Sequence, residues 1–238
     1  MKAMALDKIV SLDETETPLT LTDFPQPKPR SDELLLQVLT CGVCHTELDE
    51  IEGRTAPPKL PVILGHEVVG RVVEAGANAF QHRLGSRVGV GWIHRSSGTQ
   101  DENLDESFVA TGRDVNGGYA EYMTVPETYA YAIPKSLSSQ EAAPLLCAGA
   151  IGYRALRLSN LKNGDRLGLM GFGASAHLVV QLARHLFPQS EIFAFARRKS
   201  VQQFARDSAS LCAVFEGRPA FHCPGRRAGS HHRGAHAP

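Results

Sequence analysis

The sequence predicts an α/β protein with two domains, a β-rich one followed by a doubly wound one with a parallel sheet. Residues 1 to about 140 contain short apolar runs separated by Pro and Gly turns, which is typical of a compact barrel or sandwich. Residues 166–196 then follow the order strand, glycine-rich turn, helix and strand. A chain of 238 residues is long enough to bury a core in each domain.

Short apolar segments bounded by turn residues predict the strands of the first domain. These strands are Glu33–Leu39, Val68–Glu74, Arg87–Trp92 and Tyr119–Val125. The pattern changes near residue 139, where apolar spacing and helix formers predict a helix over Ala142–Leu158. Pro144 is compatible with the first turn of that helix.

One βαβ unit is predicted after this helix. Its strands are Arg166–Met170 and Glu191–Ala196, and its helix spans Ala174–Phe187. The apolar face of the helix is formed by Leu178, Val179, Leu182 and Leu186. Crossovers of this kind join parallel strands, so a parallel sheet is expected in the second domain.

The composition excludes several classes of function. Twenty-five basic and 25 acidic residues cancel, which leaves no electrostatic case for a nucleic-acid or membrane partner. No apolar run reaches the roughly 18 residues that span a bilayer, and the N-terminus lacks the apolar stretch of a secretory signal. Five cysteines, an odd number, favour metal binding or free thiols over a disulfide framework. The expected location is the cytoplasm.

Three short segments spread over about a hundred residues each offer one metal ligand. They are Cys44 in Cys41-Gly42-Val43-Cys44-His45-Thr46-Glu47, His66 in Gly65-His66-Glu67, and Cys147 in Leu146-Cys147-Ala148-Gly149. Two thiolates and one imidazole leave one corner of a tetrahedron open, which distinguishes a catalytic zinc from a structural one. The pattern therefore predicts a catalytic metal site.

Each ligand candidate has a purely structural alternative. The CxxC pair of Cys41 and Cys44 is by itself ambiguous between zinc binding, redox activity and coincidence, and we interpret Cys41 as a small buried apolar residue. An isolated histidine is more often a core or surface residue than a ligand, but Glu67 and the nearby glycines favour the ligand interpretation for His66. Glu67 can bind the ion or orient it, and Glu47 is either a carboxylate supporting a ligand or an ordinary solvated residue.

The turn Gly171-Phe172-Gly173-Ala174-Ser175-Ala176 resembles the glycine-rich turn that binds a dinucleotide pyrophosphate, with Ala176 in place of the third glycine. Its place between a strand and a helix strengthens this weak motif. At the end of the second strand, Ala196 occupies the position where an acidic residue would bind the ribose of NAD. Arg197 and Arg198 follow and favour NADP, unless they belong to a solvated basic loop. A Lewis acid and a hydride carrier together imply alcohol–carbonyl redox chemistry.

With these motifs in view, the chain resembles the zinc-dependent alcohol dehydrogenases of the medium-chain dehydrogenase/reductase superfamily. Gly65-His66-Glu67, Gly70, Gly76 and Ala79 fit the zinc signature of that family, and Gly117-Gly118-Tyr119-Ala120-Glu121-Tyr122 is another familiar stretch. The resemblance runs to about Asp207. It implies a GroES-like β-barrel catalytic domain over residues 1–148 and a partial Rossmann NAD(P)-binding domain over residues 149–210.

The resemblance also implies roles for individual residues. Zinc would be held by Cys44, His66 and Cys147, with Glu67 as an alternate ligand; this ligand set is known for alcohol dehydrogenases and is no independent prediction. Thr46 would hydrogen-bond the substrate oxygen, and His45 would lie near the cofactor pyrophosphate. The implied activity is the interconversion of small primary or secondary alcohols with aldehydes or ketones, using zinc and NADP in preference to NAD.

The chain departs from the family pattern in three places. The loop between Trp92 and Tyr119 has no cysteine, so no structural zinc is expected. Asp49 stands where many members have a histidine that ends the proton relay. The predicted sheet has two strands where a complete Rossmann domain has about six.

Residues 211–238 form an aberrant tail that we expect to be disordered, because from Gly217 onward it has no acidic residue and no Leu, Ile or Val. A truncated or frameshifted family member would explain both the tail and the missing strands, and it would lack the oligomer interface of the family. The alternatives are therefore a catalytically inactive zinc-binding remnant, or a zinc-free quinone reductase of the same superfamily.

Overall fold

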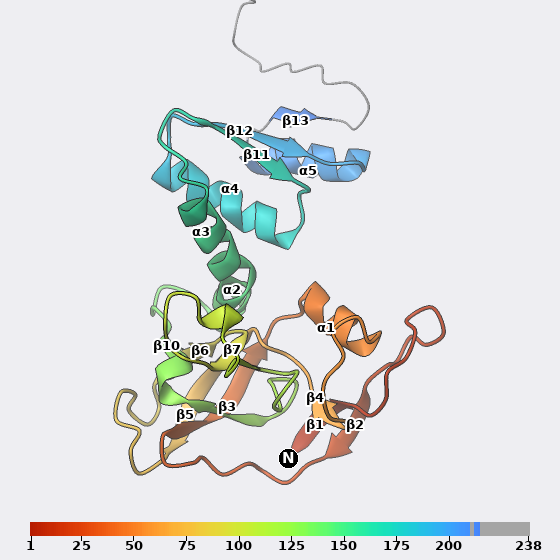
Figure 1. Ribbon diagram of the computed structural model, residues 1–238, viewed down its shortest axis with the longest axis vertical. Coiled ribbons are helices and arrows are strands. Elements are labelled where there is room, and N and C mark those ends of the chain that lie inside the picture. The colour runs from red at the N-terminus through yellow and green to blue at the C-terminus, as the bar shows by residue number, and fades with distance from the viewer. Residues whose placement is uncertain (210–211, 215–238) are drawn as a thin grey trace, which may run out of the picture. The chain divides into compact units, whose positions relative to one another are not determined.

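The computed structural model describes residues 1–209 and 212–214, and it divides into two compact units between Ile151 and Gly152 (Figure 1). The first unit consists mainly of antiparallel strands, and the second combines parallel strands with helices. The predicted α/β class, with the β-rich part first, is confirmed. None of the described helices is long and apolar enough to cross a bilayer.

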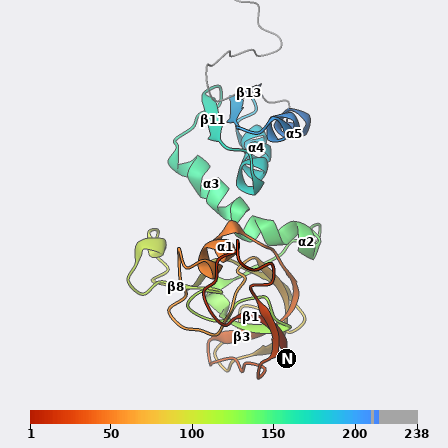
Figure 2. The same cartoon turned by 90° about the vertical axis from the view of Figure 1, so that its right-hand side faces the viewer.

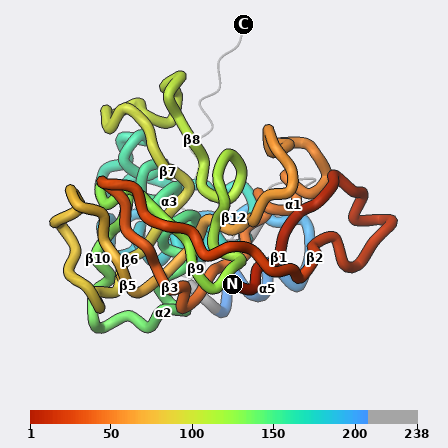
Figure 3. Tube along the Cα trace, turned by 90° about the horizontal axis from the view of Figure 1, so that it is seen from below, coloured from red at the N-terminus to blue at the C-terminus, as the bar shows by residue number. Residues whose placement is uncertain are grey.

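A five-stranded antiparallel sheet forms the centre of the first unit. Its strands follow the order β10-β6-β5-β3-β9, and Figure 3 views them from one end of the barrel. Their bounds are Ala130–Ala132 for β10, Arg87–Val90 for β6, Val68–Ala75 for β5, Glu33–Cys41 for β3 and Tyr122–Pro126 for β9. The four strands predicted from the sequence are all present, although β6 ends two residues early and β9 begins three residues late.

The core of the barrel lies on the inner face of this sheet. Alternate residues of neighbouring strands meet there, and they include Leu34, Leu36, Val68, Val72, Val88, Val90, Met123 and Val125. Each of these side chains is at most 2% exposed. Burying one side chain of this size contributes about 1.5–3 kcal/mol, so this face supplies much of the driving force for folding of the first unit.

Two smaller sheets complete the first unit. One has the order β2-β1-β4, with β1 over Lys2–Leu6, β2 over Thr20–Asp23 and β4 over Val62–Ile63. The other pairs β7 (Ile93–Arg95) with β8 (Val109–Ala110). Two short helices, α1 (His45–Ile51) and α2 (Ser139–Ala142), lie at the same end of the barrel (Figure 2).

The predicted helix over Ala142–Leu158 is wrong as a single element. A 3₁₀ turn over Ala143–Leu146 follows α2, and α3 then spans Ala148–Leu158. Cys147 separates them, with φ −124° and ψ −79° outside the helical region. Pro144 has no backbone N–H to donate, which favours the tighter turn over a continuing α-helix.

The second unit contains a parallel sheet in the order β11-β12-β13, with β11 over Arg166–Met170, β12 over Glu191–Phe195 and β13 over Cys212–Val214. Helices α4 (Ala174–Leu186) and α5 (Lys199–Ala209) contribute Val180, Ala183 and Ala205 to its core. The βαβ unit is confirmed. The expectation of two strands is wrong, because β13 adds a third; the remainder of the predicted tail lies outside the described residues.

Candidate metal centre

Cys44 lies at the start of α1, three residues after β3 ends. Its backbone is extended, with φ −109° and ψ 159°, as expected for the residue that precedes a helix. The backbone N–H of Cys44 donates to Glu47 Oε2 at 2.7 Å. This bond fixes the turn that carries the thiol, because the donor and the acceptor are only three residues apart.

His66 lies in the short connection between β4 and β5 and is 1% exposed. Its Nδ1 atom is 2.7 Å from Glu47 Oε1, and both side chains are sealed from solvent. The Trp92 ring stands edge-on against the imidazole, with ring centroids 4.9 Å apart. Because Nδ1 faces the carboxylate, Nε2 is the ring nitrogen that remains for a metal ion.

Cys147 is positioned by the break between the 3₁₀ turn and α3. The turn packs against the end of β6, where a Cβ atom on Gly91 would lie 2.7 Å from the backbone oxygen of Leu146. Any side chain at position 91 would therefore push away the residue that precedes Cys147. The close approach of the two backbones depends on glycine at this position.

Glu67 has its place in the cluster because residue 42 has no side chain. A Cβ atom on Gly42 would lie 2.0 Å from Glu67 Oε2. The backbone N–H of Gly42 also donates to the Glu67 carbonyl at 2.9 Å, which joins the two ligand-bearing segments.

The structure brings Cys44, His66, Glu67 and Cys147 together, with one ligand atom from each lying within 4.8 Å of the others. The two sulfur atoms are 3.8 Å apart. Two thiolates at about 2.3 Å from one ion, at the tetrahedral angle, would be separated by about 3.8 Å. The donor set and its spacing therefore fit a zinc ion.

The thiols and the imidazole perturb one another in this cluster. Contacts with Cys147 and His66 lower the pKa of Cys44 to about 3, whereas the Cys44 thiolate and burial raise the pKa of Cys147. Burial opposes protonation of His66, but Cys44 and Glu47 together raise its pKa to about 10. The cluster therefore attracts positive charge, and a divalent cation would displace protons from it.

The other predicted residues of this region lie on or beside α1. Thr46 Oγ1 is 3.5 Å from Cys44 Sγ. The His45 side chain is 78% exposed, and its Nε2 is 4.0 Å from Asp49 Oδ1. Cys41 is outside the ligand cluster and packs against the barrel core, where burial raises the pKa of its thiol to about 12. These positions are compatible with the predicted roles and leave them as predictions.

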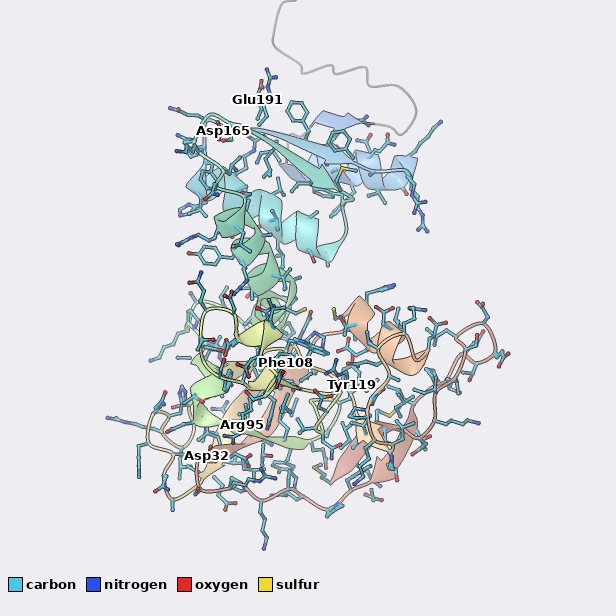
Figure 4. All side chains as sticks on the ribbon, viewed as in Figure 1. Asp32, Arg95, Phe108, Tyr119, Asp165 and Glu191 are labelled. Atoms are coloured by element: carbon cyan, nitrogen blue, oxygen red, sulfur yellow. The ribbon has the colours of Figure 1, made fainter. Side chains whose placement is uncertain are left out.

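Trp92, and two residues that lie against it, were not recognised from the sequence as part of this region. Trp92 contacts His66, Phe108 lies 6.3 Å from Trp92 between ring centroids, and the Arg113 guanidinium lies 5.6 Å from the Trp92 ring centre. Figure 4 labels Phe108 and, elsewhere on the barrel, Tyr119. Trp92 is the single tryptophan of the chain, and that is the one signal that could have singled it out.

The glycine-rich turn of the second unit joins β11 to α4. Gly171 has φ +92°, a conformation that side chains rarely allow, and its N–H donates to the Phe195 carbonyl at 2.7 Å. Gly173 precedes the first residue of α4, and no atom lies within 4 Å of a Cβ placed on Gly171 or Gly173. Ala176 is packed against the core of this unit. The first N–H groups of a helix have no acceptor within it, so this turn offers donors and open space for a phosphate.

The end of β12 carries the residues predicted to bind the ribose. Ala196 is 7% exposed, and its carbonyl accepts a hydrogen bond from Gln202 Nε2 at 2.8 Å. Arg197 and Arg198 follow it and are exposed. Their guanidinium groups can thus meet a ligand from solvent.

Comparison with known proteins agrees with the geometry of both units. Residues 30–135 match the family described as the alcohol dehydrogenase GroES-like domain. A probable alcohol dehydrogenase AdhA from Mycobacterium tuberculosis is 42% identical over 199 residues, which cover 79% of this chain and 57% of that protein. Residues 30–135 thus match an alcohol dehydrogenase GroES-like domain, and the chain as a whole is similar to alcohol dehydrogenases.

Solved structures extend this similarity to the fold of the chain. A putative zinc-binding dehydrogenase from Sinorhizobium meliloti, bound to NADP, has a TM-score of 0.77 and 30% identity, covering 90% of this chain and 61% of that one. The 2R,3R-butanediol dehydrogenase of Bacillus subtilis has a TM-score of 0.80 and 26% identity, covering 92% of this chain and 64% of that one. The fold is thus a GroES-like domain followed by part of a Rossmann domain.

The chain spans little more than half the length of the curated relatives it matches, 57% of the first and 55% of the second. The activity of the whole protein is therefore a matter for proposal.

Proposed function

We propose that Cys44, His66 and Cys147 hold one zinc ion, with Glu67 as an alternate ligand. The observation that carries this proposal is the 3.8 Å separation of the two sulfur atoms, combined with a buried imidazole and a carboxylate in the same cluster. Two sulfurs and one nitrogen leave an open coordination position, as expected for a catalytic site. The loop between Trp92 and Tyr119 has no cysteine, so the proposal includes no structural zinc.

The proposed activity is the interconversion of primary or secondary alcohols with aldehydes or ketones, with hydride transfer to or from a nicotinamide cofactor. Zinc, when bound, supplies a Lewis acid that polarises an oxygen atom. It does not change oxidation state, so an organic carrier must take the electrons. The NADP in the Sinorhizobium meliloti structure and the alcohol substrate named for the Bacillus subtilis enzyme support this proposal.

Residues of this chain would orient the substrate and protect it from water. The Thr46 hydroxyl is half-buried beside Cys44 and can accept a hydrogen bond from a substrate hydroxyl. Trp92 places aromatic surface next to His66, with Phe108 beside Trp92, and this surface would limit access of water to the ligand cluster. The His45 side chain is exposed, so the cofactor pyrophosphate can reach it, as its proposed role requires.

NADP is the preferred cofactor in this proposal. Positions 196–198 carry no carboxylate that could accept hydrogen bonds from the ribose hydroxyls of NAD. Arg197 and Arg198 can instead bind the 2′-phosphate of NADP. We expect replacement of both arginines by alanine to weaken NADP binding at least about tenfold and to leave NAD binding within twofold. Equal losses for both cofactors would contradict the preference.

The activity can be tested on the purified chain by measuring zinc content and alcohol-dependent NADPH or NADH formation on the same sample. We expect one zinc per chain and turnover, and we expect Cys147→Ser to remove both. One zinc per chain without turnover would favour the inactive zinc-binding remnant. Well-folded protein that turns over without zinc would contradict the proposed mechanism and favour a quinone reductase.

A further inference from the structure

The first unit contains a pocket whose lining includes none of the metal-centre residues. Its volume is about 390 Å³, which is in the range of small-molecule sites. The walls come from the segment between β2 and β3, from β7, from the region around β8, and from β9. Neither the proposed zinc site nor the glycine-rich turn accounts for this pocket.

The charged groups of this pocket are mostly positive. Lys28, Arg30 and Arg95 line it together with a single carboxylate, Glu33. Glu33 is 4% exposed, and its Oε2 already accepts the backbone N–H of Arg30 at 2.9 Å. The side chains of Lys28 and Arg30 make no hydrogen bond or ion pair among the described residues, so their charges remain available to a ligand.

Arg95 is the one cation of this group that is held in place. Its Nη2 donates to Asp32 Oδ2 at 2.9 Å and lies 4.0 Å from Glu33 Oε1. Figure 4 labels Asp32 and Arg95, which lie next to each other on the barrel. The ion pair orients the guanidinium, while donors on its other nitrogens stay free for a second anion.

His94 supplies a polar atom without a partner. The residue is 7% exposed, it lines the pocket, and its Nδ1 is buried with no hydrogen bond among the described residues. A buried polar atom without a partner is costly, so a bound molecule or ordered water is expected next to it. Burial, followed by the nearby Arg95 and Arg30, lowers the pKa of His94 to about 4.

The remaining lining combines apolar surface with further donors. Apolar contacts are offered by Pro25, Pro27, Val109, Val115 and Met123. Asn116 Oδ1 accepts the backbone N–H of Ile63 at 3.1 Å, which leaves its amide N–H groups to face the pocket. Tyr122 and Thr124 add hydroxyl groups. An inorganic anion would fill only a small part of this volume and would use none of the apolar surface.

We propose that this pocket binds a small organic anion, with its anionic oxygens at Lys28, Arg30 and Arg95 and its apolar body against Val109, Val115 and Met123. The site is separate from the metal centre and does not depend on the proposed dehydrogenase activity. Its ligand class is a carboxylate or a similar anion attached to an aliphatic or aromatic group.

The proposal can be tested by titrating the zinc-loaded full chain with benzoate and, separately, with inorganic phosphate, while recording ¹H–¹⁵N NMR spectra. We expect benzoate to shift the amide signals of Arg95, Val115 and Thr124 in a saturable manner. Site-resolved signals separate this binding from any binding of the carboxylate to the zinc. The absence of saturable shifts at these residues up to 20 mM benzoate, roughly the weak limit of specific binding, would overturn the proposal.

A matched pair of variants provides the control. Lys28→Gln/Arg30→Gln removes two charges from the pocket, and Lys59→Gln/Lys135→Gln removes two exposed charges elsewhere. We expect benzoate affinity to fall at least about tenfold in the first variant and to stay within twofold in the second. Equal losses of benzoate affinity in both variants would show that the affinity depends only on the net charge of the protein, and would overturn the proposed site. Binding of phosphate without binding of benzoate would overturn the assignment to an organic anion.

Discussion

Glu47 connects two of the three proposed zinc ligands through a single carboxylate. One oxygen lies 2.7 Å from His66 Nδ1, and the other accepts the backbone N–H of Cys44 at 2.7 Å. The sequence suggested a supporting carboxylate at this position and left open that Glu47 is an ordinary solvated residue. The structure shows a side chain that is 1% exposed and in contact with both ligand segments.

We expect Glu47→Gln to weaken zinc binding by about 10- to 100-fold. The amide N–H₂ of glutamine would donate to His66 Nδ1, which would place the ring proton on Nε2, the nitrogen needed for the metal. Zinc affinity can be measured by competition with a chromogenic chelator. Glu52→Gln, at the C-terminal end of the same helix and outside the ligand cluster, is the matched control and should change affinity less than twofold. Equal affinities of the E47Q and wild-type proteins would contradict the role of Glu47.

His94 predicts a pH dependence of stability. Its pKa is lowered to about 4 in the folded chain by burial and by the nearby Arg95 and Arg30, whereas an unfolded histidine titrates near 6.5. Between these values the unfolded chain binds more protons, so stability falls as the pH decreases from about 6.5 to about 4. The contribution at neutral pH is at most about 3 kcal/mol.

This contribution can be measured by urea unfolding at pH 7 and pH 5 for the wild type and for His94→Gln. We expect the variant to lose less stability than the wild type over this interval. His185→Gln, on the exposed side of α4, should behave like the wild type. An identical pH dependence in all three proteins would show that His94 does not titrate as proposed.

At the scale of elements, the interruption between α2 and α3 is what carries Cys147 to the other ligands. A continuous helix over Ala142–Leu158 would have placed this thiol on a helical surface, and the structure instead leaves it between two elements. The approach of the 3₁₀ turn to β6 depends on Gly91, where a Cβ would meet the Leu146 backbone oxygen at 2.7 Å.

We expect Gly91→Ala to lower zinc affinity at least about tenfold, because a displacement of Leu146 moves the adjacent Cys147 away from the cluster. Gly149→Ala is the matched control: a Cβ there would meet only the flexible Leu145 side chain, at 3.2 Å, inside α3. Its zinc affinity should match the wild type, and its helix should be slightly stabilised. Wild-type zinc affinity in Gly91→Ala would contradict the positioning of Cys147 by this contact.

Local sequence patterns predicted the elements well where apolar spacing was regular. The strands β3, β5, β11 and β12 and the helix α4 all begin and end within two residues of their predicted bounds. The helix break at Cys147 was missed because helix formers continue on both sides of it. The short β13 was missed because three residues are fewer than a strand pattern requires.

At the scale of the whole molecule, the sequence predicted which ligand side chains lie together, and the structure shows which contacts position them. Spacing and residue type indicated Cys44, His66 and Cys147, which come from three separate parts of the chain. The contacts that position the ligands depend on the long-range pairing of strands, which no local pattern encodes. They are the contact of Trp92 with His66 and the close backbone approaches at Gly42 and Gly91. The same holds for the pocket around Arg95, whose walls are distant in sequence.

X-ray absorption at the zinc edge of the purified full chain tests the central claim most directly. The account predicts about two sulfur ligands at about 2.3 Å and nitrogen or oxygen ligands at about 2.0–2.2 Å in the wild type, and loss of this sulfur-ligated zinc in Cys44→Ser and in Cys147→Ser. The chain also carries histidines near its C-terminus, at positions 222, 231, 232 and 236, that could bind zinc on their own. A zinc shell of nitrogen and oxygen alone, unchanged in both variants, would contradict the account.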